Sequence, residues 1–541
     1  MSWEYSLVLP LALIFLIGTV VYAGWPSDST APANQSETLV SQATGVASPA
    51  TSLPEPTTVS NPIPTPASTA ERGAQTVPLE ATSDPSSFTI EGIVADAAGE
   101  PLQGARVTDG ETVAITGGDG LFAIDVESSG SHLQVTASGF HDWVHPLTDN
   151  ERRMQVVLEQ QQVKALYLNP NMSGSEQDIQ RFIDIINSTE ANAVVIDIKE
   201  EIIYFDSQVQ LFVDAGTVRP IMDLAAVIQR FKEHDIYTIA RLVVFKDGLV
   251  AQANPDMAVL NNVTGDLWRD DNGVAWVNPM VHRLWQANAE LAVEAAGYGF
   301  DEIQYDYVRF PTDGDFSTQE FGLENTQENR QNAIEGFLQL ARERLLPTGV
   351  KQSADVFGYS LVVDDDLGIG QNFARLGQYV DYLSPMIYPS HWPDGSLAVD
   401  GHPNDFPYET IAISMRQAGL KLDGDMLRVR PWLQDFSFFD LMPYGDEEVH
   451  AQIRAVEESG ASGWMLWDPN NNYHPGALAP DPDHAPATPV TTPDSDDATP
   501  ATATPVTTPD PDDATPAPAT PVNTPAPVNP VTGRRTRPPD M

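Results

Sequence analysis

The sequence predicts a (β/α)₈ barrel over residues 163–477, with a small all-β domain before it and Pro-rich segments at either end. Eight apolar runs of strand length follow one another in this region. Most are separated by segments whose apolar residues recur at three- and four-residue spacing, as in amphipathic helices. An open doubly wound sheet is the alternative, but the turn after the first run, NPNMSGS at 169–175, lacks a Gly-rich phosphate-binding pattern.

Residues 1–25 predict a membrane anchor or a signal segment. The stretch Leu7–Tyr22 is nearly all apolar and is flanked by aromatic residues of the kind found at membrane interfaces. A cleaved signal peptide is the other interpretation, because Val21 and Ala23 give the small-residue pattern of a cleavage site. Either interpretation predicts an extracytoplasmic protein, which is single-pass and membrane-anchored or secreted.

Residues 26–85 and 478–541 are predicted to be disordered, the first as a linker and the second as a tail. They are rich in Pro, Thr, Ser and Ala and poor in aromatic residues. Such segments cannot bury enough apolar surface to offset the entropy of the chain. We therefore expect the folded part of the protein to lie between them.

Residues 86–160 predict a small antiparallel β-sandwich, because short alternating apolar runs are separated by Gly, Asp and Pro turns. The segment resembles the carboxypeptidase regulatory-like fold. That resemblance implies a spacer or binding module without catalytic chemistry. The stretches that carry it include Gly99-Glu100-Pro101-Leu102, Gly118-Asp119-Gly120 and Ser138-Gly139-Phe140.

The barrel is predicted from its runs in order. The predicted strands are 163–170, 193–200, 236–245, 302–310, 350–359, 379–388, 426–436 and 463–471. The predicted helices are 175–189, 221–235, 282–298, 332–346 and 446–460.

Composition excludes several classes of function. The net charge of -48, from 76 acidic and 28 basic residues, argues against nucleic acid as a partner. The chain has no Cys, which excludes thiolate catalysis and thiolate metal sites. No P-loop or dinucleotide turn is present, and the 10 His residues form neither H-x-H at a strand end nor H-E-x-x-H. We therefore expect no cofactor and no metal.

Reactive residues of such barrels sit at the carboxyl ends of the strands. Asp306 lies in an otherwise apolar run, where a carboxylate is costly unless it is paired or functional. An internal ion pair with Arg309 or Arg241 is the alternative to a catalytic role. Cleavage of a glycosidic bond needs two carboxyl groups. We predict Asp306 as the nucleophile or base and Asp355, on the next strand, as the proton donor, with Asp468 and Asp197 as the alternative carboxyl groups.

Other polar and aromatic residues late in the strands predict a carbohydrate site, because sugars present apolar faces to aromatic rings and hydroxyls to polar groups. A supporting ion pair between Asp197 and Lys199, and a capping role for Asp468, are the competing interpretations for those residues. The predicted substrate-binding residues are Asp197, Lys199, Arg241, Trp276, Gln304, Arg309, Tyr388, His391, Trp432, Gln434, Trp467 and Asp468.

From Lys164 to about Pro475 the chain resembles a bacterial family of barrel domains classed as glycosyl hydrolases of unknown function. The resemblance implies a relation to α-galactosidase and α-amylase-like hydrolases, in which the Asp of strand 4 is commonly the nucleophile. Several of those relatives carry the acid/base on strand 5 or 6, and strand 6 here offers no late carboxylate, which leaves Asp355. The stretches that carry the resemblance include Gln304-Tyr305-Asp306-Tyr307-Val308-Arg309-Phe310-Pro311, Ser353-Ala354-Asp355-Val356-Phe357-Gly358 and Arg430-Pro431-Trp432-Leu433-Gln434.

The sequence thus favours a glycoside hydrolase acting on extracellular or cell-wall polysaccharide. A non-catalytic carbohydrate-binding barrel displayed on a stalk is the alternative. It gains support if Asp355 points away from Asp306. A metal-dependent deacetylase or amidohydrolase is disfavoured by the missing His motifs.

Overall fold

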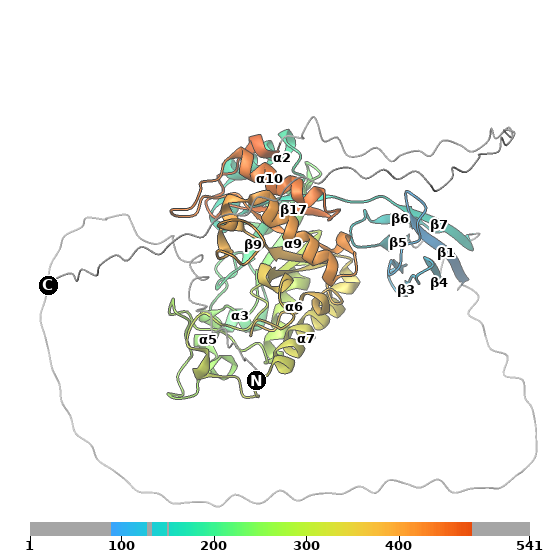
Figure 1. The fold of residues 1–541 in the computed structure, drawn as a ribbon. Helices are drawn as coiled ribbons and strands as arrows, with labels where there is room; N and C mark the ends of the chain where they lie inside the picture. The colour runs from blue at the N-terminus through green and yellow to red at the C-terminus, as the bar shows by residue number, and fades with distance from the viewer. Residues whose placement is uncertain (1–87, 127–131, 149–150, 479–541) are drawn as a thin grey trace, which may run out of the picture. The chain divides into compact units, whose positions relative to one another are not determined.

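The computed structural model describes residues 88–126, 132–148 and 151–478 (Figure 1). The predicted anchor or signal segment, the linker up to residue 85 and the tail from residue 479 lie outside these residues. Their assignments therefore stay predictions from the sequence.

The β-rich segment before the barrel folds as two sheets around one core. One sheet has the order β4-β1-β7 and the other β3-β2-β5-β6. Strand β1 pairs with β4 in antiparallel fashion but with β7 in parallel. The predicted antiparallel arrangement therefore fails at the β1–β7 pairing and holds at the others. The strands are β1 (Phe88–Asp96), β2 (Arg106–Thr108), β3 (Val113–Ile115), β4 (Leu121–Val126), β5 (His132–Thr136), β6 (Trp143–Pro146) and β7 (Arg153–Leu158).

The predicted (β/α)₈ barrel is confirmed. Eight parallel strands close on themselves in the order β10-β12-β14-β15-β16-β17-β8-β9, so the last strand of the barrel pairs with the first. The strands are β8 (Val163–Leu168), β9 (Ala193–Lys199), β10 (Tyr237–Val243), β12 (Glu302–Asp306), β14 (Lys351–Phe357), β15 (Tyr382–Met386), β16 (Trp432–Gln434) and β17 (Gly463–Trp467). Strands β11 (Leu260–Asn261) and β13 (Gln319–Glu320) pair with each other outside the barrel.

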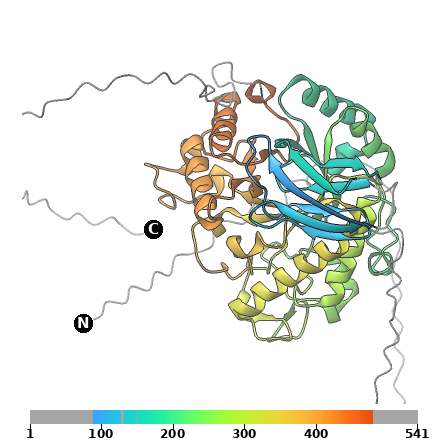
Figure 2. The same cartoon turned by 90° about the vertical axis from the view of Figure 1, so that its right-hand side faces the viewer.

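Helices surround the closed sheet, as the ring from teal through yellow to orange in Figure 2 shows. The five predicted helices are present, and the structure adds the long helix α9 and the short helices α1, α3, α5 and α8. The helices are α1 (Pro170–Ser173), α2 (Glu176–Ser188), α3 (Gln210–Asp214), α4 (Leu224–Lys232), α5 (Gly248–Ala253), α6 (His282–Ala296), α7 (Gln327–Leu345), α8 (Phe373–Leu376), α9 (Pro407–Lys421) and α10 (Asp446–Glu457).

Several helices begin where the sequence supplies a capping side chain. The Ser175 hydroxyl accepts from the backbone N–H of Asp178 at the start of α2. Asp223 and Thr326 cap α4 and α7 in the same way. Each cap satisfies one of the N–H groups that a helix leaves without an internal partner, so these boundaries follow from local sequence.

Alternate residues of each strand divide the barrel core into two parts. Val194, Ile196 and Ile198 of β9 pack outward with the helices. Ala193 and Val195 point into the barrel, where they meet Tyr167 and residues of the other strands. Asp197 continues the inward series. The period of two therefore decides that a carboxylate late in β9 faces the axis of the barrel.

None of the helices in the described part of the chain combines the length and apolarity that a bilayer crossing requires.

Candidate active site

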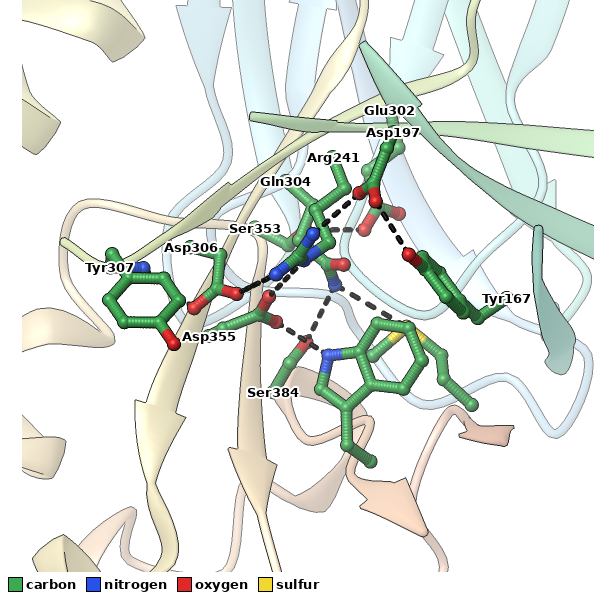
Figure 3. A network of polar contacts seen from close by, with 12 residues as sticks. Tyr167, Asp197, Arg241, Glu302, Gln304, Asp306, Tyr307, Ser353, Asp355 and Ser384 are labelled. Carbon is green, nitrogen blue, oxygen red and sulfur yellow. Dashed lines mark hydrogen bonds and ion pairs between the residues drawn. The ribbon is translucent and has the colours of Figure 1, made fainter. Parts of the chain in front are cut away.

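Four neighbouring strands bring their polar side chains to one place inside the barrel. Arg241 on β10 is in register with Asp197 on β9 and with Gln304 on β12. Asp306 follows two residues after Gln304. Tyr305 is in register with Ala354, so Asp306 and Asp355 are the next residues on adjacent strands. Inward-facing residues at this height form one cluster (Figure 3).

Arg241 lies at the centre of the cluster. Its Nε donates to Asp306 Oδ2 at 3.0 Å, and its Nη2 donates to the same oxygen. Its Nη1 donates to Asp197 Oδ1 at 2.5 Å. The guanidinium thus bridges two carboxylates from opposite neighbouring strands, with the fixed fork geometry that suits Arg to this role.

Asp355 lies on β14, which pairs with the edge of β12 opposite to β10 and Arg241. Its Oδ1 accepts from the indole Nε1 of Trp432 at 2.7 Å, and its Oδ2 lies 4.0 Å from Arg241 Nε. Burial, followed by the neighbouring charge of Asp306, raises the pKa of Asp355 well above its usual range, against the opposing charge of Arg241. Asp355 is therefore a carboxylic acid that keeps its proton where an ordinary aspartate has lost it.

The two predicted catalytic carboxyl groups lie close together. Arg241 Nε is 3.0 Å from Asp306 Oδ2 and 4.0 Å from Asp355 Oδ2. These two oxygens are therefore at most about 7 Å apart. Carboxyl groups are about 5–5.5 Å apart in retaining glycosidases and about 6.5–9.5 Å apart in inverting ones, and the upper limit of about 7 Å excludes neither class. The pair is compatible with either stereochemical outcome.

Asp197 is held from its other side by a tyrosine. Tyr167 Oη donates to Asp197 Oδ2 at 2.6 Å, and the Tyr167 ring stacks on Trp467 with ring centroids 3.9 Å apart. Burial raises the pKa of Asp197 to about 6, although the charge of Arg241 opposes this shift. Asp197 is completely buried, so its place is behind Arg241 and not in contact with solvent.

Strand β12 ends in a strained turn directly after Asp306. Tyr307 has a φ of 48°, in the left-handed region that bulky residues rarely adopt. In this conformation its backbone N–H donates to Asp306 Oδ1 at 2.6 Å. Both oxygens of Asp306 are thereby fixed, one by Arg241 and one by the turn. Backbone strain at such a position is typical of functional sites.

A polar layer lies below the cluster. Gln304 Nε2 donates to Ser384 Oγ and approaches Met465 Sδ, both at 3.3 Å. Two residues earlier on β12, Glu302 accepts from Arg430 at 2.7 Å and from Ser353 Oγ at 2.5 Å. The inward side of β12 thus carries Glu302, Gln304 and Asp306 in succession, and only Asp306 stands at the open end of the strand.

The comparison with protein families decides the family of this chain. The family described as "Putative glycosyl hydrolase domain" matches residues 165–473, which is more than half of the chain and nearly the whole barrel. The chain belongs to this glycosyl hydrolase family. No curated protein matches it in sequence.

Solved structures similar to the glycosyl hydrolase chain include a hypothetical protein from Ruminiclostridium thermocellum ATCC 27405. It is 36% identical, with 35% of this chain and 97% of that chain covered and a TM-score of 0.32. The glycoside hydrolase domain of PgaB (BpsB) from Bordetella bronchiseptica is 12% identical, with 59% and 99% covered and a TM-score of 0.45. TtGalA, an α-galactosidase from Thermus thermophilus, is 12% identical, with 69% of each chain covered and a TM-score of 0.35.

Of the ion pairs considered from the sequence, the glycosyl hydrolase domain forms Asp306–Arg241 but not Asp197–Lys199. Lys199 does not pair with Asp197. Its Nζ lies 2.8 Å from Asp247 and donates to the carbonyl of Val243 at 2.7 Å. A shift in register between β9 and β10, beside Arg241, accompanies this separation. Asp306 pairs with Arg241, one of the two partners that the sequence offered.

Two residues predicted to bind substrate lie in a separate buried cluster. Arg309 pairs with Asp313 at 3.1 Å, and its guanidinium lies 4.8 Å from the ring centroid of Trp276. The Trp276 indole donates to Asp270 at 3.1 Å, and its side chain is completely buried. This cluster joins the loops after β10 and β12, so it supports the cluster around Arg241 from outside.

Two more predicted residues hold loops at the barrel end. Gln434 Oε1 accepts from Ser390 N at 3.0 Å, and its Nε2 donates to Phe436 O at 2.9 Å. Asp468 Oδ1 accepts from the backbone N–H groups of Asn470 and Asn472 at 2.6 and 3.3 Å. The capping interpretation of Asp468 thus describes the contacts that it makes.

The remaining predicted residues are aromatic. Trp432 and Trp467 lie beside the cluster, with ring centroids 5.6 Å apart. Tyr388 and His391 follow β15 and are half-buried, with centroids 5.3 Å apart. Tyr388 also lies within the electrostatic reach of Asp355 and Asp306, whose charges add to burial in raising the pKa of its hydroxyl.

Sequence reasoning missed Tyr167, Ser384 and the turn at Tyr307. Tyr167 occupies an inward position late in the first predicted strand, so the period of two could have indicated it. The φ of Tyr307 has no signal in the sequence. Across the ranges that the structure describes, no group of three or more His, Asp or Glu is arranged to hold a metal ion.

Proposed function

We propose that this chain is a glycoside hydrolase of extracellular or cell-wall polysaccharide, with Asp306 and Asp355 as its catalytic pair. The observation that carries the proposal is the meeting of these two carboxyl groups on one guanidinium, together with the raised pKa of Asp355. A carboxylate and a carboxylic acid side by side are what glycosidic bond cleavage requires.

In the proposed reaction, Asp355 gives its proton to the glycosidic oxygen while the bond from that oxygen to the anomeric carbon breaks. Asp306 either attacks the anomeric carbon or takes a proton from the water that does so. If Asp306 attacks, water then releases the sugar from it and gives a proton back to Asp355. If Asp306 acts as the base, it ends with the proton of the water, and exchange with solvent returns Asp306 to the carboxylate and Asp355 to the acid. Arg241 orients Asp306 throughout, and Trp432 orients Asp355 through its 2.7 Å hydrogen bond.

The first prediction concerns the catalytic pair. Asp306→Asn and Asp355→Asn should each lower kcat by roughly 10²–10⁴-fold, because each variant loses the group that transfers the proton or attacks the sugar. The measurement is release of reducing ends from a panel of bacterial polysaccharides. Asp468→Asn is the matched control, since Asp468 lies at the same end of the barrel but accepts only backbone N–H groups in its loop.

Thermal unfolding of each variant separates a lost catalytic group from a lost fold, because Asp306→Asn weakens the bonds from Arg241. Folded Asp306→Asn protein with undiminished activity would reassign the nucleophile. Activity lost in Asp468→Asn and kept in Asp355→Asn would move the acid role to Asp468.

A non-catalytic glycan-binding barrel is the second candidate, and one observation favours it. The side chains of Asp306 and Asp355 are only 7% and 1% exposed, and Arg241 occupies the space between them and Asp197. This candidate predicts that the wild-type protein binds a polysaccharide and releases no reducing ends from it. The same panel therefore decides between the two functions.

A further inference from the structure

A series of aromatic rings runs from the catalytic cluster along the loops after β15 and β16. The ring of Tyr388 lies 5.3 Å from that of His391, and His391 lies 5.4 Å from Phe438. Phe438 in turn lies 4.5 Å from Phe439. Phe436 packs beneath them, 5.9 Å from Tyr388. These distances join five rings into a continuous aromatic track.

The inner end of the track is Tyr388, which follows β15, and β15 pairs with the strand β14 that carries Asp355. Burial, and after it the charges of Asp355 and Asp306, raise the pKa of the Tyr388 hydroxyl. His391 is uncharged at neutral pH because burial lowers its pKa to about 4. The middle of the track therefore presents a neutral flat ring, and not a cation, to whatever lies on it.

The outer end of the track is exposed and strained. The Phe439 side chain is 72% exposed, so burial does not account for a large apolar ring there. Its φ of 42° lies in the left-handed region, where Gly or Asn would be the unstrained choice. A bulky residue kept in such a conformation and pointed at solvent suggests a role in binding.

The charge of the two loops limits what can bind. Residues 387–406 and 435–445 contain no Lys or Arg, and they carry the exposed residues Asp394, Asp400, Asp405 and Asp440. A glycan with carboxylate or sulfate groups would be repelled, whereas a neutral or amine-bearing glycan would not.

We infer that Phe439 and Phe438, with His391, form an outer subsite on which an extended non-anionic polysaccharide stacks its sugar rings. This inference rests on the proposed function in that it takes the barrel mouth as a glycan site. It adds that the substrate is a chain long enough to reach beyond Tyr388, and that it lacks acidic sugars.

The test measures binding of the full chain to three soluble probes, namely a neutral β-glucan, chitosan oligomers and polygalacturonate. Wild-type protein should bind at least one of the first two and not polygalacturonate. Phe439→Ala should weaken that binding roughly 3- to 10-fold, the range expected for loss of one aromatic contact, and Phe439→Trp should retain it. Phe316→Ala is the matched control, because Phe316 is also exposed, at 62%, but lies outside both loops.

A second variant separates binding from structure. Phe439→Gly relieves the backbone strain, so it should unfold at the same or a higher temperature than wild type while binding as weakly as Phe439→Ala. A purely structural role for Phe439 predicts the opposite order of stability. Unchanged binding in Phe439→Ala, tighter binding of polygalacturonate than of the other probes, or no binding of either non-anionic probe by the wild type would overturn the inference.

Binding and hydrolysis fail separately. If Phe439→Ala weakens binding but the wild type releases no reducing ends, the subsite stands and the catalytic proposal falls. If the wild type hydrolyses a polysaccharide and Phe439→Ala leaves its KM unchanged, the catalytic proposal stands and the subsite falls.

Discussion

Arg241 is shared by three carboxyl groups: it bonds Asp306 and Asp197 directly and lies 4.0 Å from Asp355. One guanidinium cannot neutralise three carboxylates, so at least one of them must be protonated or accept a high energetic cost of burial. Asp355 has the strongest reason to keep its proton, since it is buried, lies next to Asp306 and has no direct bond from Arg241. Asp355 is thus the acid of the pair, because Arg241 bonds the other two carboxyl groups directly.

The pH dependence of activity tests this assignment. Because the pKa of Asp355 is raised in the folded protein, the acid is present at neutral pH and is lost as the pH rises through that value. We expect kcat/KM of the wild type to fall on the alkaline side for this reason. In Asp355→Asn the residual activity should lack this alkaline fall. An alkaline fall that persists in this variant would assign it to another group.

The same shift predicts a change in stability. The folded state holds the Asp355 proton more tightly than the unfolded chain does. The stabilisation is therefore complete below the pKa of an unfolded aspartate and is lost as the pH rises through the folded pKa. Urea unfolding at a series of pH values should show this loss in the wild type and a smaller loss in Asp355→Asn.

At the scale of elements, closure of the barrel depends on close contact between its last and first strands. Gly463 opens β17 with a φ of 117°, in register with Val163 of β8. A Cβ at this position would lie 2.0 Å from the carbonyl oxygen of Val163. Glycine is therefore required at Gly463 both by its backbone conformation and by the approach of the neighbouring strand.

Gly463→Ala tests this requirement, with Gly460→Ala as its matched control. Gly460 also has a positive φ, of 76°, but its Cβ would meet nothing within 4 Å. We expect Gly460→Ala to lower the free energy of unfolding by about 1–2 kcal/mol from backbone strain, and Gly463→Ala to lower it by roughly 1–3 kcal/mol more from overpacking. If urea unfolding showed equal losses of free energy in the two variants, close packing between β17 and β8 would not be what requires the glycine.

The helix that the pattern missed shows what a sequence hides at this scale. The buried side of α9 includes Thr410 and Ser414 beside Ile411 and Met415. The Ser414 hydroxyl bonds Thr410 O at 2.7 Å, and the Thr410 hydroxyl bonds Pro403 O at 3.0 Å. Because two of the five buried positions of α9 are polar, its helical pattern in the sequence is weak.

At the scale of the whole molecule, the place of the chain relative to a membrane depends on its N-terminal segment. We propose that Leu7–Tyr22 anchors the chain in a membrane, from its apolar sequence alone. The net charge of -48 would keep the rest of the molecule away from anionic lipid headgroups. Membrane association should therefore depend on this segment and not on the folded surface.

Cell fractionation tests the anchor. The full chain should sediment with membranes and resist extraction by salt, whereas a chain that begins at residue 26 should not sediment. Release of the full chain into the medium in a shortened form would instead support cleavage after Ala23. Sedimentation of the chain lacking residues 1–25 would place the membrane contact elsewhere.

The sequence alone determined the barrel and the strand positions of its carboxylates. Burial of one face of a helix or strand leaves a periodic pattern of apolar residues, and this pattern can be recognised in a short stretch of sequence. The sequence also indicated that Asp306 and Asp355 stand on adjacent strands. Only the tertiary structure decided which cation each carboxylate meets. Arg241 reaches Asp197 and Asp306 across 44 and 65 residues of sequence, and the nearby Arg309 turns to Asp313. Such pairings depend on barrel closure and on the register of neighbouring strands, which no local pattern encodes.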